Sequence, residues 1–100
     1  MTMARLRHIV LFRFYDAIDE DSRMHAVDQI SALRDQPGIL EWTLTASIDD
    51  RKGPVIVQNV LFETEDAFEL YRQNTKHKAV GETLSGMADW LVADYVEEER

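Results

Sequence analysis

The chain has 100 residues, no cysteine and a formal net charge of −8. This length fits one domain with one core, and the lack of cysteine excludes disulfides, thiolate catalysis and zinc–sulfur sites. No apolar run approaches the ~20 residues that span a bilayer, Arg13 interrupts the first apolar run too early for a signal peptide, and the 11 Lys and Arg form no stripe for nucleic acid. We therefore expect a single cytoplasmic domain over residues 1–100 that binds neither nucleic acid nor membranes.

The first third of the chain predicts a strand followed by a helix. Residues 8–14 are mostly β-branched and aromatic, which is typical of a strand. Capping and acidic residues at positions 19–22 favour the start of a helix, and Pro37-Gly38 ends it. The apolar face of this helix consists of Ala26, Val27, Ile30 and Leu33.

The middle of the chain predicts a β-hairpin. Residues 40–48 alternate between apolar and polar side chains, which indicates a second strand. A polar loop at residues 49–54 then leads into a third strand over residues 55–62. The apolar positions of the alternation are Leu40, Trp42, Leu44, Ala46 and Ile48.

The last third predicts a second helical segment and a fourth strand. Thr64 is the expected N-cap of this segment, and Asn74-Thr75 is expected to break it in two. Residues 90–96 then form a strand that closes the domain. The inward positions of the helical segment are Ala67, Phe68, Tyr71, Val80, Leu84 and Met87.

The order of elements, β-α-β-β-α-β, predicts a ferredoxin-like α+β fold with an antiparallel sheet. Right-handed crossovers place the first and third strands in the centre, with both helices on one face. Both faces are apolar, because His8, Val10 and Phe12 alternate with Ile9 and Leu11 in the first strand. Since a bare apolar face is an unusually large exposed patch, we expect a second copy to cover it. Two such sheets would close into an α+β barrel in a homodimer.

Four features, in order along the chain, resemble the stress-responsive A/B barrel domain family, also called Dabb. They are the opening segment His8–Phe14, the turn Pro37-Gly38, the spacing Tyr71-x5-His77 and the ending Val92-Ala-Asp-Tyr95. The resemblance implies a ferredoxin-like domain that dimerises through its sheets. Members of the family include plant stress-associated proteins, bacterial proteins and a plant polyketide cyclase that acts without a cofactor.

The resemblance also implies a pocket, because the positions of His8, Tyr71 and His77 line one in the cyclase-like members. An imidazole titrates near neutral pH and a phenol can donate a hydrogen bond to a developing oxyanion. We therefore identify Tyr71 and His77 as the candidate catalytic pair. The expected pocket, which would take a small apolar or aromatic ligand, is lined by His8, Val10, Phe12, Tyr71, His77, Val80 and Leu84.

Three functions remain open at this point. The first is a dimeric binding protein with an apolar pocket, the second a cofactor-independent enzyme of the cyclase or monooxygenase type, and the third a purely structural dimer. The family commonly has His-Pro where this chain has Asn74-Thr75. A further pocket histidine of the cyclase falls near the position of Ile56, so that polar group is missing here. Both departures favour binding over catalysis. With no His-x-x-x-His pair and no glycine-rich phosphate loop in the sequence, we expect neither a metal nor a cofactor.

Overall fold

The computed structural model describes residues 4–98 and shows an α+β domain of the predicted ferredoxin-like architecture. The second helical segment is divided into two helices, as expected, and a short 3₁₀ helix follows the first helix. In chain order the elements are β1 (Ala4–Phe14), α1 (Glu20–Ser31), the 3₁₀ helix η1 (Ala32–Asp35), β2 (Ile39–Ala46), β3 (Val55–Phe62), α2 (Glu65–Gln73), α3 (Thr75–Ser85) and β4 (Ala88–Glu98).

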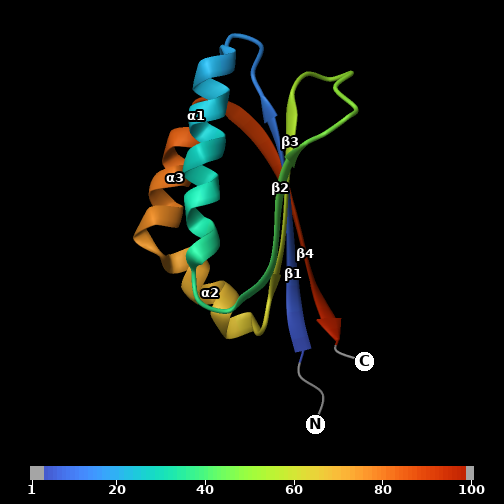
Figure 1. The fold of residues 1–100 in the computed structure, drawn as a ribbon, viewed down its shortest axis with the longest axis vertical. Coiled ribbons are helices and arrows are strands. Elements are labelled where there is room, and N and C mark those ends of the chain that lie inside the picture. The colour runs from blue at the N-terminus through green and yellow to red at the C-terminus, as the bar shows by residue number, and fades with distance from the viewer. Residues whose placement is uncertain (1–3, 99–100) are drawn as a thin grey trace.

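The four strands form one antiparallel sheet in the order β2-β3-β1-β4. The prediction that β1 and β3 are central is therefore confirmed. All the helices lie along one face of the sheet, as Figure 1 shows, and within residues 4–98 no element covers the opposite face. We call this opposite face the open face. None of the helices in the described part of the chain is long and apolar enough to cross a membrane.

A side-chain cap fixes the start of each α-helix. The Oδ1 atom of Asp19 accepts a hydrogen bond from the backbone N–H of Ser22 (2.7 Å) and begins α1. The Oγ1 atom of Thr64 accepts from the backbone N–H of Ala67 (3.1 Å) and begins α2. These caps satisfy donors that have no partner inside a helix, and both lie where the sequence predicted a helix start.

The turn at Pro37-Gly38 is specified by glycine. Gly38 has a φ angle of 85°, in the region that side chains disfavour. A Cβ atom at this position would lie 2.5 Å from the Cβ atom of Ala67 in α2. The backbone N–H of Glu63 donates to the carbonyl of Gly38 at 2.8 Å. The turn therefore holds the start of β2 against the start of α2.

The core lies between the sheet and the helices, and it consists of two adjoining clusters. One cluster gathers under α2 around Phe62 and Tyr71, and the other gathers under α1 around Phe14. Trp42 and Val80 pack against both clusters and join them. Burial of one such large apolar side chain stabilises a fold by about 1.5–3 kcal/mol.

The predicted alternation over residues 40–48 is wrong at both ends. A β-bulge between Ile39 and Glu41 places an extra residue in β2, so Ile39 pairs with Phe62 and Leu40 is 48% exposed. At the other end, β2 stops at Ala46. Ile48 lies in the following loop and is fully exposed.

The strands β1 and β4 are longer than predicted because they pair with each other along their whole length. β1 and β4 pair over eleven residues, from Ala4 with Glu98 to Phe14 with Ala88. The sequence predicted only residues 8–14 and 90–96, where the apolar residues are concentrated. Charged residues at the ends of both strands interrupt the apolar pattern, so the sequence pattern does not indicate that the strands continue.

Candidate functional site

A cavity of about 300 Å³ lies between the sheet and the helices α2 and α3. Its floor comes from β1 and β4, and its roof from the two helices, since their side chains face each other across it. All seven residues that the sequence analysis placed in one pocket line this cavity. They are His8, Val10 and Phe12 of β1, Tyr71 of α2, and His77, Val80 and Leu84 of α3.

His8 lies on the floor of the cavity and is held by a carboxylate. Its side chain points from β1 towards the helices and is 8% exposed. The Nδ1 atom of His8 lies 2.5 Å from Oδ1 of Asp94, its direct neighbour on β4. Because a carboxylate only accepts, Nδ1 carries the proton and Nε2 of the neutral ring is left as an acceptor. Asp94 thus sets both the orientation and the tautomer of the imidazole.

Tyr71 presents a hydroxyl group to the same space. The Nε2 atom of Gln58 on β3 donates a hydrogen bond to the Oη atom of Tyr71 at 3.1 Å. Since Oη accepts this bond, its own proton is available to a ligand. Burial raises the pKa of Tyr71 to about 12, and the hydrogen bond from Gln58 only partly opposes this shift. The group is therefore a neutral donor at physiological pH.

His77 reaches the cavity because the helical segment breaks between it and Tyr71. In one continuous helix these two positions would point about 120° apart around the axis. Instead, Asn74 ends α2 and caps α3 through a hydrogen bond from the backbone N–H of Lys76 to its Oδ1 atom (2.8 Å). The rings of Tyr71 and His77 then lie 4.7 Å apart between centroids.

The imidazole of His77 is biased towards its neutral form. Burial is the main cause that lowers the pKa of His77, and electrostatic interactions with His8 and Arg72 lower it further. A hydrogen bond from the ring to the backbone carbonyl of Arg72 acts in the opposite direction. In the neutral ring one nitrogen is a donor and the other an acceptor.

Together these side chains provide one neutral donor and two imidazole acceptors in apolar surroundings. Such a set can bind the polar group of an otherwise apolar molecule, and it can move a proton next to a carbonyl group. Within residues 4–98, no three His, Asp or Glu side chains gather as metal ligands would.

Two polar residues of the site, Asp94 and Gln58, were not predicted. Each lies at an inward position of a strand whose other inward residues are apolar, as Val92 is beside Asp94 and Val60 beside Gln58. A polar residue on the apolar side of an alternating strand is the signal that could have identified them. Their partners, however, follow only from the registers of the strands and the placement of α2.

A second, larger hollow of about 670 Å³ lies between α1 and the β2–β3 hairpin. No residue of the predicted site lines it, and its charged residues are at its exposed rim, among them Glu20, Asp28 and Asp50. Size alone does not mark the functional cavity, because a binding site also needs polar groups that converge on its interior. The smaller cavity meets this condition.

Comparison with known proteins agrees with the fold described above. The family model of the stress responsive A/B barrel domain, Dabb, matches residues 6–97. The chain belongs to this family. No curated protein shows significant similarity to the Dabb domain described here.

Solved structures share the fold of this Dabb domain at low sequence identity. A dimeric ferredoxin-like protein of unknown function from Thermobifida fusca has a TM-score of 0.82 and 20% identity, over 95% of this chain and 92% of that one. A Dabb family protein from Mesorhizobium loti gives 0.75 and 20%, over 94% and 97%. A hydroxynitrile lyase from Passiflora edulis gives 0.82 and 14%, over 96% and 95%.

Proposed function

We propose that this Dabb domain is a homodimer that binds a small, largely apolar molecule with a carbonyl or hydroxyl group in the cavity of each protomer. The observation that carries the proposal is the convergence of His8, Tyr71 and His77 on one apolar cavity. A buried donor or acceptor without a partner is costly. A ligand that satisfies these three groups therefore gains both hydrogen bonds and apolar burial.

The protonation states of the site favour an uncharged ligand. The pKa of Tyr71 is raised by burial and that of His77 is lowered mainly by burial, so both side chains are neutral near physiological pH. The Asp94 carboxylate is already bonded to His8. Arg72 also lines the cavity, but its guanidinium is paired with Glu69 (3.0 Å). A free carboxylate on the ligand would therefore have to lose its hydration and compete with Glu69 for this arginine.

The cavity can be blocked without altering its polar groups. Gly81 lies in α3 and lines the cavity, and a Cβ atom added there would meet nothing within 4 Å. Leucine is a good helix former, so Gly81→Leu should keep the fold and fill the space. Small aromatic ketones, phenols and aliphatic ketones would be screened by ligand-observed NMR against the wild type.

We expect hits that bind the wild type to lose binding in Gly81→Leu and to weaken about two- to tenfold in Tyr71→Phe, since one hydrogen bond is worth about 0.5–1.5 kcal/mol. His25→Ala, in which the changed side chain is exposed on α1, is the matched control and should bind normally. Ligands that bind Gly81→Leu and the wild type equally would place binding elsewhere and refute this site.

The open face supports the dimer. On this face Leu11 is 40% exposed, Leu91 68% and Tyr95 50%. Monomeric proteins rarely expose an apolar patch of this kind. A charge at its centre, Leu11→Asp, should give a monomer in light scattering. Leu70→Asp, at a 69% exposed position on α2, should leave the dimer intact. A wild type that is monomeric at micromolar concentration contradicts the proposal.

A second candidate function, proton transfer without a cofactor, is favoured by the His8–Asp94 pair. A histidine whose Nδ1–H is held by a carboxylate is oriented to act as a base through Nε2. Tyr71 could then donate to the oxygen on which charge develops. The fold is compatible with such chemistry, because the structurally similar protein from Passiflora edulis is a hydroxynitrile lyase.

The two functions differ in their response to Asp94→Asn. If the protein is an enzyme, turnover of any ligand that the wild type converts should fall at least tenfold in this variant. The reason is that the amide can turn its NH₂ group towards Nδ1 of His8 and reverse the tautomer of the imidazole. Binding affinity should change far less. If no bound ligand exchanges a proton adjacent to its carbonyl with solvent deuterium faster than in buffer, the binding function stands alone.

A further inference from the structure

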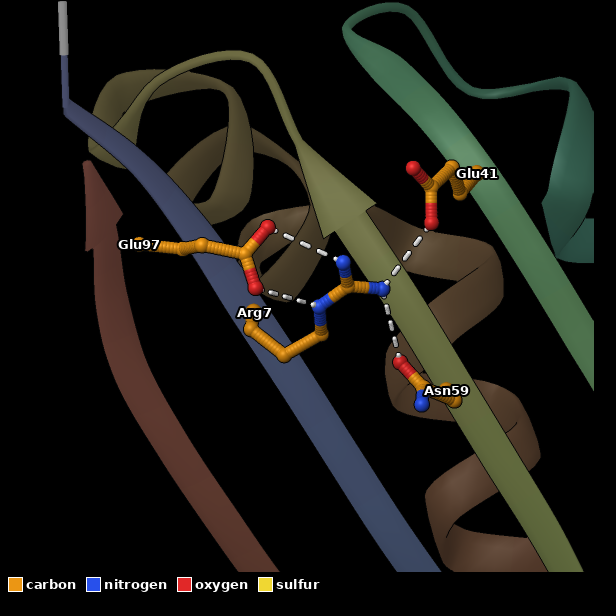
Figure 2. Close-up of polar contacts among 4 residues, drawn as sticks. All are labelled: Arg7, Glu41, Asn59 and Glu97. Atoms are coloured by element: carbon orange, nitrogen blue, oxygen red, sulfur yellow. Dashed lines mark hydrogen bonds and ion pairs between the residues drawn. The ribbon is translucent and has the colours of Figure 1, made fainter. Parts of the chain in front are cut away.

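A single arginine on the open face joins all four strands. Figure 2 shows Arg7 of β1 with Glu41, Asn59 and Glu97, and we call these four residues the Arg7 cluster. Its Nε and Nη2 atoms donate to the two carboxylate oxygens of Glu97 on β4, at 3.2 and 3.0 Å. Its Nη1 atom donates to Asn59 on β3 at 3.1 Å and to Glu41 on β2 at 3.2 Å. The Arg7 side chain is only 14% exposed.

The other charges of the open face are also balanced within the face. Arg13 lies opposite Asp89 at the far end of β1, with an Nη2 to Oδ2 distance of 3.7 Å. Arg5 lies opposite Glu97, and its charge contributes, after the hydrogen bonds from Arg7, to the lowered pKa of Glu97. Three arginines thus meet three carboxylates: Arg5, Arg7 and Arg13 with Glu41, Asp89 and Glu97.

The open face is therefore neutral on a chain whose net charge is −8. Among residues 4–98, the excess negative charge lies outside these strand positions. Between the two charged ends, the face presents an apolar centre that consists of Ile9, Leu11, Val57, Leu91 and Ala93. A face without net charge has no electrostatic preference for a basic protein or for an anionic surface. It does suit an identical chain, which brings the same patch to the interface.

We infer that the Arg7 cluster is an electrostatic determinant of self-association, which neutralises the open face so that a second copy of this acidic chain can cover it. This inference rests on the homodimer proposed above and names the residues that permit it. Without Arg7, Glu41 would lose its arginine and Glu97 would keep only Arg5, so each face would bring one uncompensated negative charge into the interface. Buried charges that lose their partner are strongly destabilising, and like charges across an interface select against it.

Sedimentation equilibrium of the full chain tests the inference. Arg7→Gln removes the positive charge and should raise the dimer dissociation constant about tenfold or more, with a smaller effect at about 0.5 M salt because the repulsion is screened. The double variant Arg7→Gln/Glu97→Gln makes the face neutral again and should recover most of the affinity. Arg51→Gln is the matched control, since Arg51 pairs with Asp49 in the β2–β3 loop (2.6 Å).

Each outcome separates charge from shape. Recovery in the double variant supports the inference, whereas a double variant as weak as Arg7→Gln, or an Arg7→Gln protein that dimerises like the wild type, overturns it. If Arg7→Gln does not fold, as judged by circular dichroism, the single variant Arg13→Gln at the other end of the face should still weaken the dimer. An unchanged dissociation constant for Arg13→Gln would also overturn the inference. A monomeric wild type would refute the proposed homodimer itself, which is a distinct result.

Discussion

Removal of the Tyr71 hydroxyl should change how stability depends on pH. Burial raises the pKa of Tyr71 to about 12, from about 10 in an unfolded chain. The fold therefore favours the protonated phenol, so this contribution is complete below about pH 10 and is lost as the pH rises towards about 12. Each pKa unit corresponds to 1.36 kcal/mol, so the loss should be about 1.4 kcal/mol at about pH 11 and about 2–3 kcal/mol in total.

Tyr71→Phe keeps the ring in the core but leaves the buried Gln58 amide without its acceptor. At pH 7 the wild type should be more stable by about 1 kcal/mol, the net value of such a hydrogen bond. Urea unfolding at increasing pH should show this advantage disappear by about pH 11. Tyr15→Phe, at an exposed position, should show no such convergence. If the wild type and Tyr71→Phe lose stability in parallel across this range, the phenol is not buried as described.

The remaining predictions concern His77 and Gly38. The lowered pKa of His77 means that the unfolded chain binds more protons below about pH 6.5, so stability should fall as the pH drops through that value. Over the same drop in pH, the urea midpoint of His77→Gln should fall less than that of the wild type. An NMR titration that gives an ordinary histidine pKa for the wild-type His77 ring would contradict this prediction. Gly38→Ala should cost about 1–3 kcal/mol because of its φ of 85° and the contact with Ala67. Gly81→Ala is the control in thermal unfolding and should raise stability by about 0.5–1 kcal/mol; equal melting temperatures for the two variants would refute the strain at Gly38.

The parts of the fold that depend on local patterns could be predicted from the sequence. The apolar run of β1, the caps at Asp19 and Thr64 and the break at Asn74 each follow from a few neighbouring residues. The separation of Ile9 and Leu11 from His8, Val10 and Phe12 onto opposite faces follows from simple alternation. The bulge in β2 has no such local signal, since it is a feature of the pairing between Ile39 and Glu41 of β2 and the neighbouring strand β3.

The candidate site shows the same division. His8, Tyr71 and His77 could be assigned to one pocket because the resemblance to Dabb proteins implies it, and each residue also shares a helical or strand face with apolar residues. Asp94 could not be connected with His8, because 86 residues separate them in the sequence and only the register of β1 with β4 makes them neighbours. A register is set by the whole ladder, so no short motif specifies which polar side chains meet across it.

The break at Asn74 gives the cavity a roof in two pieces. Tyr71 is held by one helix and His77 by the other, and the joint between them is fixed outside the lining by a hydrogen bond from Nδ2 of Asn74 to Oε1 of Gln36 (3.0 Å). The angle between the two helices therefore depends on a contact that no ligand touches. In this chain, the dimensions of the cavity and the chemistry of its walls are separate variables. A change at Asn74 or Gln36 can alter which molecules fit while every group that binds them stays the same.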